Sequence, residues 1–539
     1  MARLVLGPLL RHVSATSATV WFEADAPCTV EVLGHSARTF AVSGHHYALV
    51  DVVDLEQGST TPYTVALDGE RCWPEEDSPY PASAIRTLGE GSLELAFGSC
   101  RVAAPHEPPY TESDGIDALS ALAERLRERP PETWPDALLM LGDQVYADAL
   151  SPATRAFITE RRSVFEPPFH EVADFEEYTR LYWEAWGEPA VRWLLANLPT
   201  AMIFDDHDIH DDWNTSAAWR ADMAEQAWWP ERITSGLMSY WVYQHLGNLS
   251  PQGRAADELY QRALGTDDAT SALHEFAARA DATTDGSRWS YSWELGTSRL
   301  IVIDSRAGRV LTGGKRQMID EGDWHFVERE MRTPADHLLL ATSLPYLLPP
   351  AIHGLEAWNE AVCAGAWGRS AAHVGEQIRR GLDLEHWAAF ESSFRRLTDL
   401  IRSAATGAHG HPPASVVVLS GDVHYAYLAR ADVGAGSAPV YQAVCSPLRN
   451  ALPETVKRAT RATISRRAAT VGRWLARSAG VAPPAIDWEI DAGPFFDNQL
   501  ATLTLDQREA TLRLERARLA NDTPYLEPVW QRRLTPEEL

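Results

Sequence analysis

After residue 92, short apolar runs recur along the chain, and long stretches with helical spacing lie between them. The six runs are Leu93–Phe97, Ala137–Leu141, Ala201–Phe204, Leu300–Ile303, Leu338–Ala341 and Val416–Leu419. Each run has the length of a buried β-strand, and the alternation with helical stretches is typical of a layered α/β domain. Two of the helical stretches, 175–198 and 220–250, are rich in tryptophan.

The first 90 residues have a different pattern. Short runs rich in β-branched residues, such as Ser17–Glu23, Cys28–Leu33 and Tyr63–Leu67, are separated by turn residues. Short strands at regular spacing predict an all-β sandwich of immunoglobulin or fibronectin type. We therefore expect two domains, 1–90 and 91–539, and we expect a closing β-hairpin around residues 496–514.

The polar residues that follow the apolar runs are the first candidates for a functional site. Carboxylates follow four of the runs: three are followed by the segments Gly142–Asp148, Asp205–Asp208 and Ser420–His424, and the fourth by Asp304. Parallel strands bring their carboxyl ends to one edge of a sheet, so these side chains should meet there. Clustered buried carboxylates are costly unless a cation compensates their charge. The pattern predicts a metal site.

Composition narrows the class of protein. The chain has 539 residues, 45% of them hydrophobic, and a net charge of −27 at pH 7. A disordered chain is excluded, and a protein that serves as a nucleic-acid scaffold is disfavoured because phosphate binding needs a basic surface. The five cysteines form no CxxC pair, which argues against a disulfide framework and a structural zinc site.

The sequence also predicts where in the cell the protein is found. No apolar stretch reaches the length of a membrane span, and the apolar run near the first residues is shorter than that of a signal peptide. We expect a cytoplasmic protein. The oligomeric state is left open.

Four motifs together resemble one known family. They are Gly98-Ser99-Cys100, Gly142-Asp143-Gln144-Val145-Tyr146-Ala147-Asp148, Asp205-Asp206-His207-Asp208 and Ser420-Gly421-Asp422-Val423-His424. Their order and spacing are similar to those of the alkaline phosphatase D (PhoD-like) metallophosphoesterases. The resemblance implies a metallophosphoesterase-type α/β fold, a layered β-sheet sandwich flanked by helices, with a small N-terminal β-domain.

The resemblance also implies roles for individual residues. Cys100 corresponds to a thiolate ligand, Asp143 to the carboxylate that bridges two metals, and Tyr146 to a phenolate ligand. Asp206 lies where related enzymes have an asparagine ligand, and Asp422 with His424 corresponds to the last ligand pair. Family members use a ferric ion (Fe³⁺) together with calcium. The donors agree with this: thiolate, phenolate and imidazole suit a redox-capable transition metal, and oxygen donors suit a hard cation such as calcium. Magnesium, manganese or zinc are alternatives at the second site.

The remaining candidates act on the substrate. The resemblance places His207 at the position of the motif's histidine, where it would protonate the leaving oxygen or bind phosphoryl oxygens. Asp208 would either orient His207 or support the metal ligands from behind. Arg306 and Arg309 follow the strand that ends near Asp304 and are candidates for binding the phosphate.

We therefore expect hydrolysis of phosphate esters, diesters or monoesters, by a metal-activated water. The tryptophan-rich insertions suit a small-molecule or lipid-like ester with an apolar flank. Two alternatives stay open: a non-catalytic scaffold that keeps the metals for stability, and a metallohydrolase that acts on a non-phosphate ester.

One basic segment stands out in this acidic chain. Residues 457–477 hold seven lysines and arginines, and Ile464, Ala468, Val471 and Leu475 fall at helical spacing. The pattern predicts a basic amphipathic helix. This helix has three interpretations: a surface helix on the body, a lid over the site, or a contact with an anionic membrane. The segment is the one candidate for membrane contact.

Overall fold

The computed structural model describes residues 1–284 and 286–536. The N-terminal region is all-β. One antiparallel sheet has the order β1 (Leu4–Val13), β2 (Ala18–Ala24), β6 (His45–Val52), β5 (Phe40–Val42). A second has the order β4 (His35–Arg38), β3 (Thr29–Val32), β8 (Val65–Leu67), β9 (Glu70–Trp73), and β7 (Thr60–Pro62) pairs with β10 (Ala84–Arg86). The immunoglobulin or fibronectin type of this region stays a prediction.

The N-terminal β-region packs tightly on the rest of the chain. The ring centroids of Trp21 and Tyr47 lie 5.2 and 5.5 Å from that of Tyr243. The indole of Trp21 also donates to the carbonyl of Val242 at 2.9 Å. The apolar core of the body therefore extends without interruption into one face of the N-terminal region.

Arg11 is one of the polar side chains that join the N-terminal region to the body. Its guanidinium is fully buried and donates to the carbonyls of Thr200, Tyr243 and Gln244 at 3.0, 2.9 and 2.8 Å, and to Asn248 Oδ1 at 2.9 Å. One side chain therefore satisfies four buried acceptors of the body, which would otherwise carry a desolvation cost.

Two larger sheets form the body. The first has the order β13 (Thr200–Ile203), β12 (Ala137–Leu141), β11 (Leu93–Gly98), β21 (Gln499–Asp506), β22 (Glu509–Ala520), β23 (Thr523–Arg533). Strands β11 to β13 are parallel, and β21 runs antiparallel to β11. The predicted closing hairpin is present as β21 and β22, with Asp506 opposite Glu509.

The second sheet has seven strands in the order β14 (Tyr291–Leu295), β15 (Ser298–Ile303), β16 (His337–Thr342), β17 (Ser415–Ser420), β19 (Val440–Val444), β18 (Ala426–Asp432), β20 (Asp487–Phe495). Leu339 and Val417 of this sheet share a core with Leu95 and Leu503 of the first, so the two sheets face each other. The predicted layered α/β fold is present.

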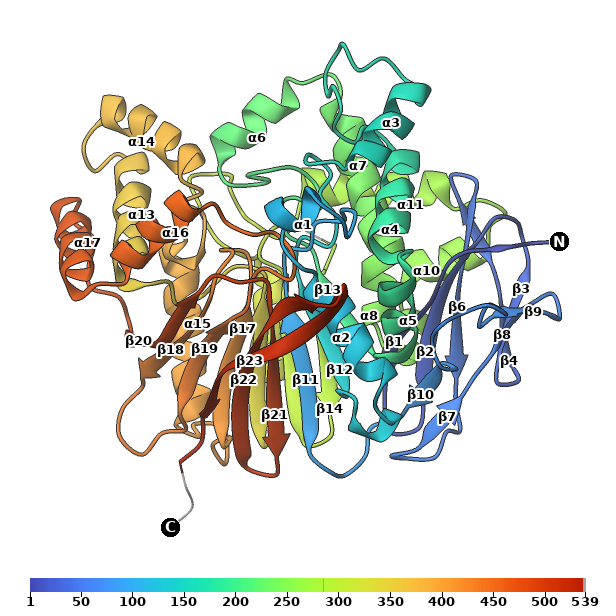
Figure 1. The fold of residues 1–539 in the computed structure, drawn as a ribbon. Coiled ribbons are helices and arrows are strands. Elements are labelled where there is room, and N and C mark those ends of the chain that lie inside the picture. The colour runs from blue at the N-terminus through green and yellow to red at the C-terminus, as the bar shows by residue number, and fades with distance from the viewer. Residues whose placement is uncertain (285, 537–539) are drawn as a thin grey trace.

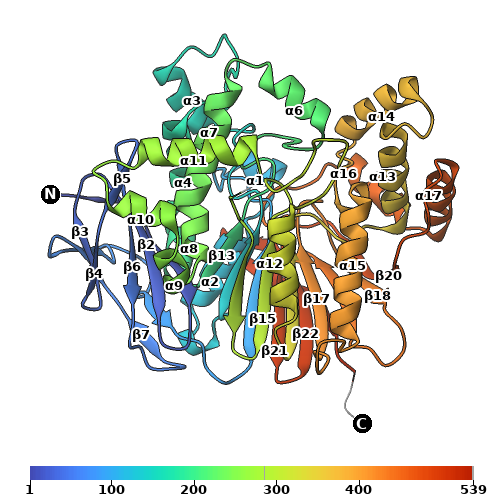
Figure 2. The ribbon, with the colours of Figure 1, turned by 180° about the vertical axis from the view of Figure 1, so that it is seen from behind.

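Helices cover the outer faces of both sheets. The helices α2 (Ala118–Arg127) and α5 (Pro189–Asn197) lie on the first sheet, and α12 (Glu321–Met331) and α15 (Glu391–Ala405) lie on the second (Figures 1 and 2). The other α-helices are α1 (Tyr110–Ser113), α3 (Pro152–Arg161), α4 (Phe175–Trp186), α6 (Ala217–Ala224), α7 (Trp229–Tyr240), α8 (Leu246–Asn248), α9 (Pro251–Ala255), α10 (Glu258–Leu264), α11 (Thr270–Ala282), α13 (Pro350–Cys363), α14 (Arg369–Gly381), α16 (Glu454–Thr463) and α17 (Arg466–Ser478). Short 3₁₀ turns lie at η1 (Pro131–Thr133) and η3 (Trp387–Ala389), and a π-helical turn lies at η2 (Trp241–His245).

The single basic helix predicted over 457–477 is two helices, α16 and α17. The chain breaks at Ser465, whose hydroxyl accepts a hydrogen bond from the amide of Ala468 at 3.2 Å and caps α17. The buried face of α17 consists of Ala469, Gly472 and Ala476, whereas Val471 points outward. No helix of the described residues is both long and apolar enough to cross a bilayer.

We expect Arg11→Met to destabilise the protein by about 3 kcal/mol, because it leaves buried carbonyl acceptors without a donor. Urea denaturation followed by circular dichroism measures the loss. The matched control is Arg38→Met on the exposed strand β4, which should change stability by no more than about 0.5 kcal/mol. Equal midpoints for the two variants would contradict the anchoring role of Arg11.

Candidate metal centre

The candidate site residues meet beyond the carboxyl ends of the parallel strands. Cys100 follows β11, Asp143 follows β12, Asp206 and His207 follow β13, and Asp422 follows β17. Three of them have a left-handed backbone, with φ of 56° at Cys100, 52° at Asp143 and 65° at Asp422. Such conformations are costly for residues other than glycine and cluster at functional sites.

The tight turn before Asp143 depends on Gly142. Its φ is 104°, and a Cβ there would lie 2.6 Å from the Cβ of Asp205. A side chain at this position would push the ends of β12 and β13 apart, so glycine permits the close approach of the two carboxylate loops.

The first donor group combines sulfur, oxygen and nitrogen. Donor atoms of Cys100, Asp143 and His424 lie within 4.8 Å of one another. The hydroxyl of Tyr146 donates to Asp143 Oδ2 at 3.3 Å and accepts from the Asn450 side-chain amide at 3.0 Å. The fold thus brings together four of the predicted donors.

A second donor group adjoins the first through Asp143. Donor atoms of Asp143, Asp206 and His207 lie within 4.8 Å of one another, and so do those of Asp205, Asp206 and Asp422. Asp143 Oδ1 is buried and has no hydrogen-bond partner among the described residues. An unpartnered carboxylate oxygen between two sets of donors fits a bound cation.

Burial and neighbouring negative charges both raise the pKa values of the acidic groups in this site. Burial raises the pKa of Asp143 well above its usual range, and the neighbouring carboxylates of Asp205 and Asp206 raise it further. Burial also raises the pKa of the Cys100 thiol and of the Tyr146 phenol, and Asp143 adds to both shifts. A metal ion would supply the positive charge that favours their ionised forms, so the residues present fit a metal centre.

His207 is held by Asp148, which lies in the second motif but was not among the predicted site residues. His207 Nδ1 lies 2.9 Å from Asp148 Oδ1, and Asp148 also accepts from the amide of Asp211 at 2.6 Å. Burial would lower the pKa of His207, but Asp206 and Asp148 outweigh it and raise the pKa well above its usual value. The side chain of His207 is 26% exposed, so its ring reaches the opening of the site.

Asp208 forms hydrogen bonds behind the candidate metal ligands. Its carboxylate accepts from the backbone amides of Asp143 and Asp205, both at 2.9 Å, and from the side-chain amide of Gln244 at 3.0 Å. It therefore joins two strand ends below the site. Within the described residues it forms no hydrogen bond with His207, which Asp148 orients instead.

Arg306 lies inside the carboxylate cluster. It is completely buried and pairs with Asp205 and Glu385. Its Nη2 lies 3.2 Å from Asp206 Oδ1 and 3.9 Å from Asp422 Oδ1. The guanidinium is therefore a fixed positive charge beside the second donor group.

Arg309 lies behind Arg306. Its Nη1 lies 3.0 Å from Glu385 Oε2 and donates to the carbonyl of Asn214 at 3.0 Å. Both arginines were predicted to bind phosphate, but Arg306 is the one that faces the donor groups.

The loop between α14 and η3 contributes residues that the strand-end pattern does not predict. His386 Nε2 lies 2.9 Å from Asp422 Oδ2, and its Nδ1 lies 2.6 Å from Glu356 Oε1 on α13. Burial would lower the pKa of His386, but the two carboxylates outweigh it and raise the pKa. Glu385 and His386 follow a helix rather than a strand, so the pattern of polar residues after apolar runs does not indicate them.

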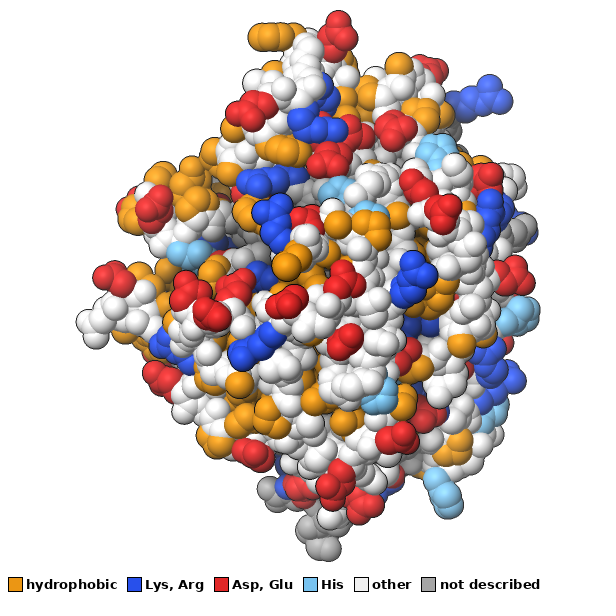
Figure 3. Space-filling view, turned by 90° about the vertical axis from the view of Figure 1, so that its right-hand side faces the viewer, with side chains coloured by type: hydrophobic (Ala, Val, Ile, Leu, Met, Phe, Trp, Pro, Cys, Tyr) orange, Lys and Arg blue, Asp and Glu red, His pale blue; other side chains and the backbone are white. Residues whose placement is uncertain are grey.

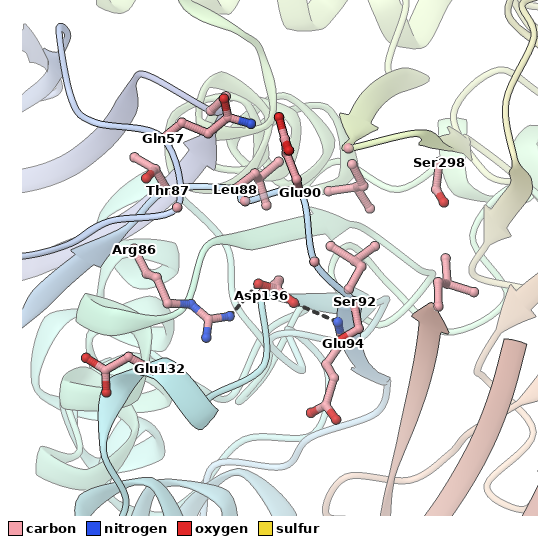
Figure 4. Close-up of a pocket in the computed structure, with 18 of the residues that line it drawn as sticks. Gln57, Arg86, Thr87, Leu88, Glu90, Ser92, Glu94, Glu132, Asp136 and Ser298 are labelled. Carbon is pink, nitrogen blue, oxygen red and sulfur yellow. Dashed lines mark hydrogen bonds and ion pairs between the residues drawn. The ribbon is translucent and has the colours of Figure 1, made fainter. Parts of the chain in front are cut away.

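A large cavity lies away from this centre. It has a volume of about 1190 Å³ and lies between the N-terminal β-region and the starts of β11, β12 and β15 (Figure 4). Arg86 pairs there with Asp136, which also accepts from the amide of Glu94 at 2.7 Å. Because these residues lie at the opposite ends of the strands, the cavity is not part of the metal centre.

Two family models match parts of this chain. A family model described as PhoD-like phosphatase matches residues 114–265, and a model described as a domain of unknown function matches residues 1–85. A solved structure titled "Structure of PhoD" has a TM-score of 0.60 and 12% identity, covering 98% of this chain and 90% of that one. The predicted resemblance to PhoD-like phosphatases is confirmed.

A second solved structure has a related fold. It is a purple acid phosphatase from seeds of yellow lupin (Lupinus luteus), with a TM-score of 0.50 and 10% identity, covering 98% of this chain and 74% of that one. At these identities the two structures show a shared fold. No curated protein matches the chain significantly.

We expect Asp148→Asn to lower the pKa of His207, because a neighbouring carboxylate favours the protonated ring. An NMR titration of histidine-labelled, chelator-treated protein measures the shift, with His207→Gln to assign the signal. The control is Asp211→Asn, whose exposed carboxylate lies 3.8 Å from His207 Nε2 and should have a smaller effect. Equal shifts in both variants would refute the pairing.

Proposed function

We propose that this chain is a metal-dependent hydrolase of phosphate esters. The observation that carries the proposal is the unpartnered, buried Asp143 Oδ1 between a sulfur- and nitrogen-containing donor group and an oxygen-rich one. The PhoD-like family model and the two phosphatase folds support the same reaction class.

The donor chemistry supports a choice of metals. Cys100, Tyr146 and His424 with Asp143 would hold a ferric ion, since thiolate, phenolate and imidazole suit a transition metal. Asp206 and Asp422 with Asp143 would hold calcium, or magnesium, manganese or zinc in its place. Bound metals supply Lewis-acid chemistry: they polarise phosphoryl oxygens and lower the pKa of water.

The chain's own residues position the ester and move the proton. His207, held through Nδ1 by Asp148, would donate a proton from Nε2 to the leaving oxygen. Arg306 contributes a fixed positive charge beside Asp206 and Asp422, where it offsets part of the carboxylate charge that would repel a phosphate.

The substrate class and the finer assignments belong to the same proposal. We favour a small-molecule or lipid-like ester, and a diester over a monoester. A domain boundary near residue 90, an N-terminal sandwich of immunoglobulin or fibronectin type, and a cytoplasmic location stay predictions.

The test compares Asp143→Asn with the exposed control Asp267→Asn. We expect Asp143→Asn to lose bound metal, measured by mass spectrometry of the elements, and to lose turnover of a chromogenic phosphodiester and its monoester by at least about 100-fold. The control should keep both. Full turnover in Asp143→Asn would refute the site.

The same assay separates the alternatives. Metal retained by the wild-type protein without turnover of either ester would favour the scaffold or an enzyme of non-phosphate esters. Chelator-sensitive turnover that is absent from Asp143→Asn would support the phosphoesterase.

A further inference from the structure

The segment of α16 and α17 concentrates positive charge in an acidic protein. Residues 454–478 contain seven lysines and arginines and one acidic residue, Glu454, whereas the whole chain has a net charge of −27. Glu454 pairs with Lys457 at 2.9 Å. Within the described chain, Arg466, Arg467 and Arg477 form no ion pair, so their charge is available to a partner.

Close packing determines which face of α17 points outward. A Cβ on Gly472 would lie 2.7 Å from the carbonyl oxygen of Ala351, and one on Gly354 would lie 2.5 Å from the backbone of Gly472. Helices α13 and α17 therefore touch through their backbones at these glycines. The face that holds Ala469, Gly472 and Ala476 is buried, and the opposite face is left to solvent.

The outward face of α17 combines apolar and basic side chains. Val471 is 61% exposed and Trp474 is 67% exposed, and their spacing of three residues puts them side by side. Arg467 lies one turn before Val471, and Arg477 lies one turn after Trp474. The apolar pair is therefore flanked by a positive charge at each end.

The position of α17 makes this face accessible. The helix lies at the outer edge of the molecule, on the side opposite the N-terminal β-region, in both ribbon views (Figures 1 and 2). Its end is held there by Trp367, whose indole donates to the carbonyl of Ser478 at 3.2 Å. On the side that carries the N-terminal region, acidic and basic side chains are interspersed (Figure 3).

We propose that the outward face of α17 (Arg467, Val471, Trp474 and Arg477) binds the surface of an anionic phospholipid bilayer. Tryptophan favours the bilayer interface, and arginines are attracted to anionic headgroups. Single-stranded RNA can stack a base on Trp474 but has no apolar surface for Val471, whereas the bilayer interface takes up both side chains.

The test uses full-length protein and sedimented vesicles, one set of phosphatidylcholine alone and one of equal parts phosphatidylcholine and phosphatidylglycerol. We expect binding to the anionic vesicles at low salt, and weaker binding as salt rises. Val471→Ser with Trp474→Ser should weaken binding by about tenfold or more. The matched control, Val53→Ser with Phe165→Ser, removes two exposed apolar residues elsewhere and should bind as wild type.

A charge variant gives an independent result. Arg467→Gln with Arg477→Gln keeps the apolar pair and should also weaken binding by about tenfold or more. Repeating the assay in the Asp143→Asn background separates docking from substrate binding at the metal centre, and binding should persist there. Absence of vesicle binding at low salt, or equal binding of the α17 variants and the control, would overturn the proposal. Binding of an RNA homopolymer that is tighter than vesicle binding would overturn it as well.

Discussion

The crowding of carboxylates around one buried arginine is the constraint on which the centre depends. Four carboxylates surround Arg306, those of Asp205, Asp206, Glu385 and Asp422. Arg309 also pairs with Glu385, and His386 pairs with Asp422. These three positive groups do not balance the four carboxylates together with the adjoining Asp143. In a water-poor interior such an excess of negative charge must be relieved by protonation or by cations. The same excess of negative charge that destabilises the carboxylate cluster without a cation also favours the binding of metal ions there.

The scaffold holds this arrangement through its backbone. Gly142 allows two strand ends to approach, and Asp208 binds the amides of Asp143 and Asp205 from below. A left-handed conformation at Asp422 directs its side chain toward the same point. Because both sheets are packed into one core, the strand ends cannot separate easily. The packing of the whole fold therefore offsets the unfavourable free energy of the crowded charges.

The strands and the residues after them could be predicted from the sequence, because apolar runs mark buried strands and their carboxyl ends share one edge. That reasoning anticipated that carboxylates from different strand ends meet, as Asp206 does with both Asp143 and Asp422, and a family resemblance added their expected roles. It could not locate Glu385 and His386, which enter from a loop between helices and depend on tertiary packing. It also could not determine which face of the basic segment packs on the body, because the contact depends on the small Gly472 meeting Gly354 of another helix.

The position of α17 matters for membrane binding because the protein as a whole is acidic. A chain with a net charge of −27 is repelled by an anionic surface, but salt screens that repulsion beyond about 8 Å. Side chains that project from the edge of the molecule can then contact the anionic membrane while the acidic body stays farther away. The glycine contact between α13 and α17 leaves the arginines and Trp474 in that position, so the orientation of a docked molecule would follow from the packing of two helices.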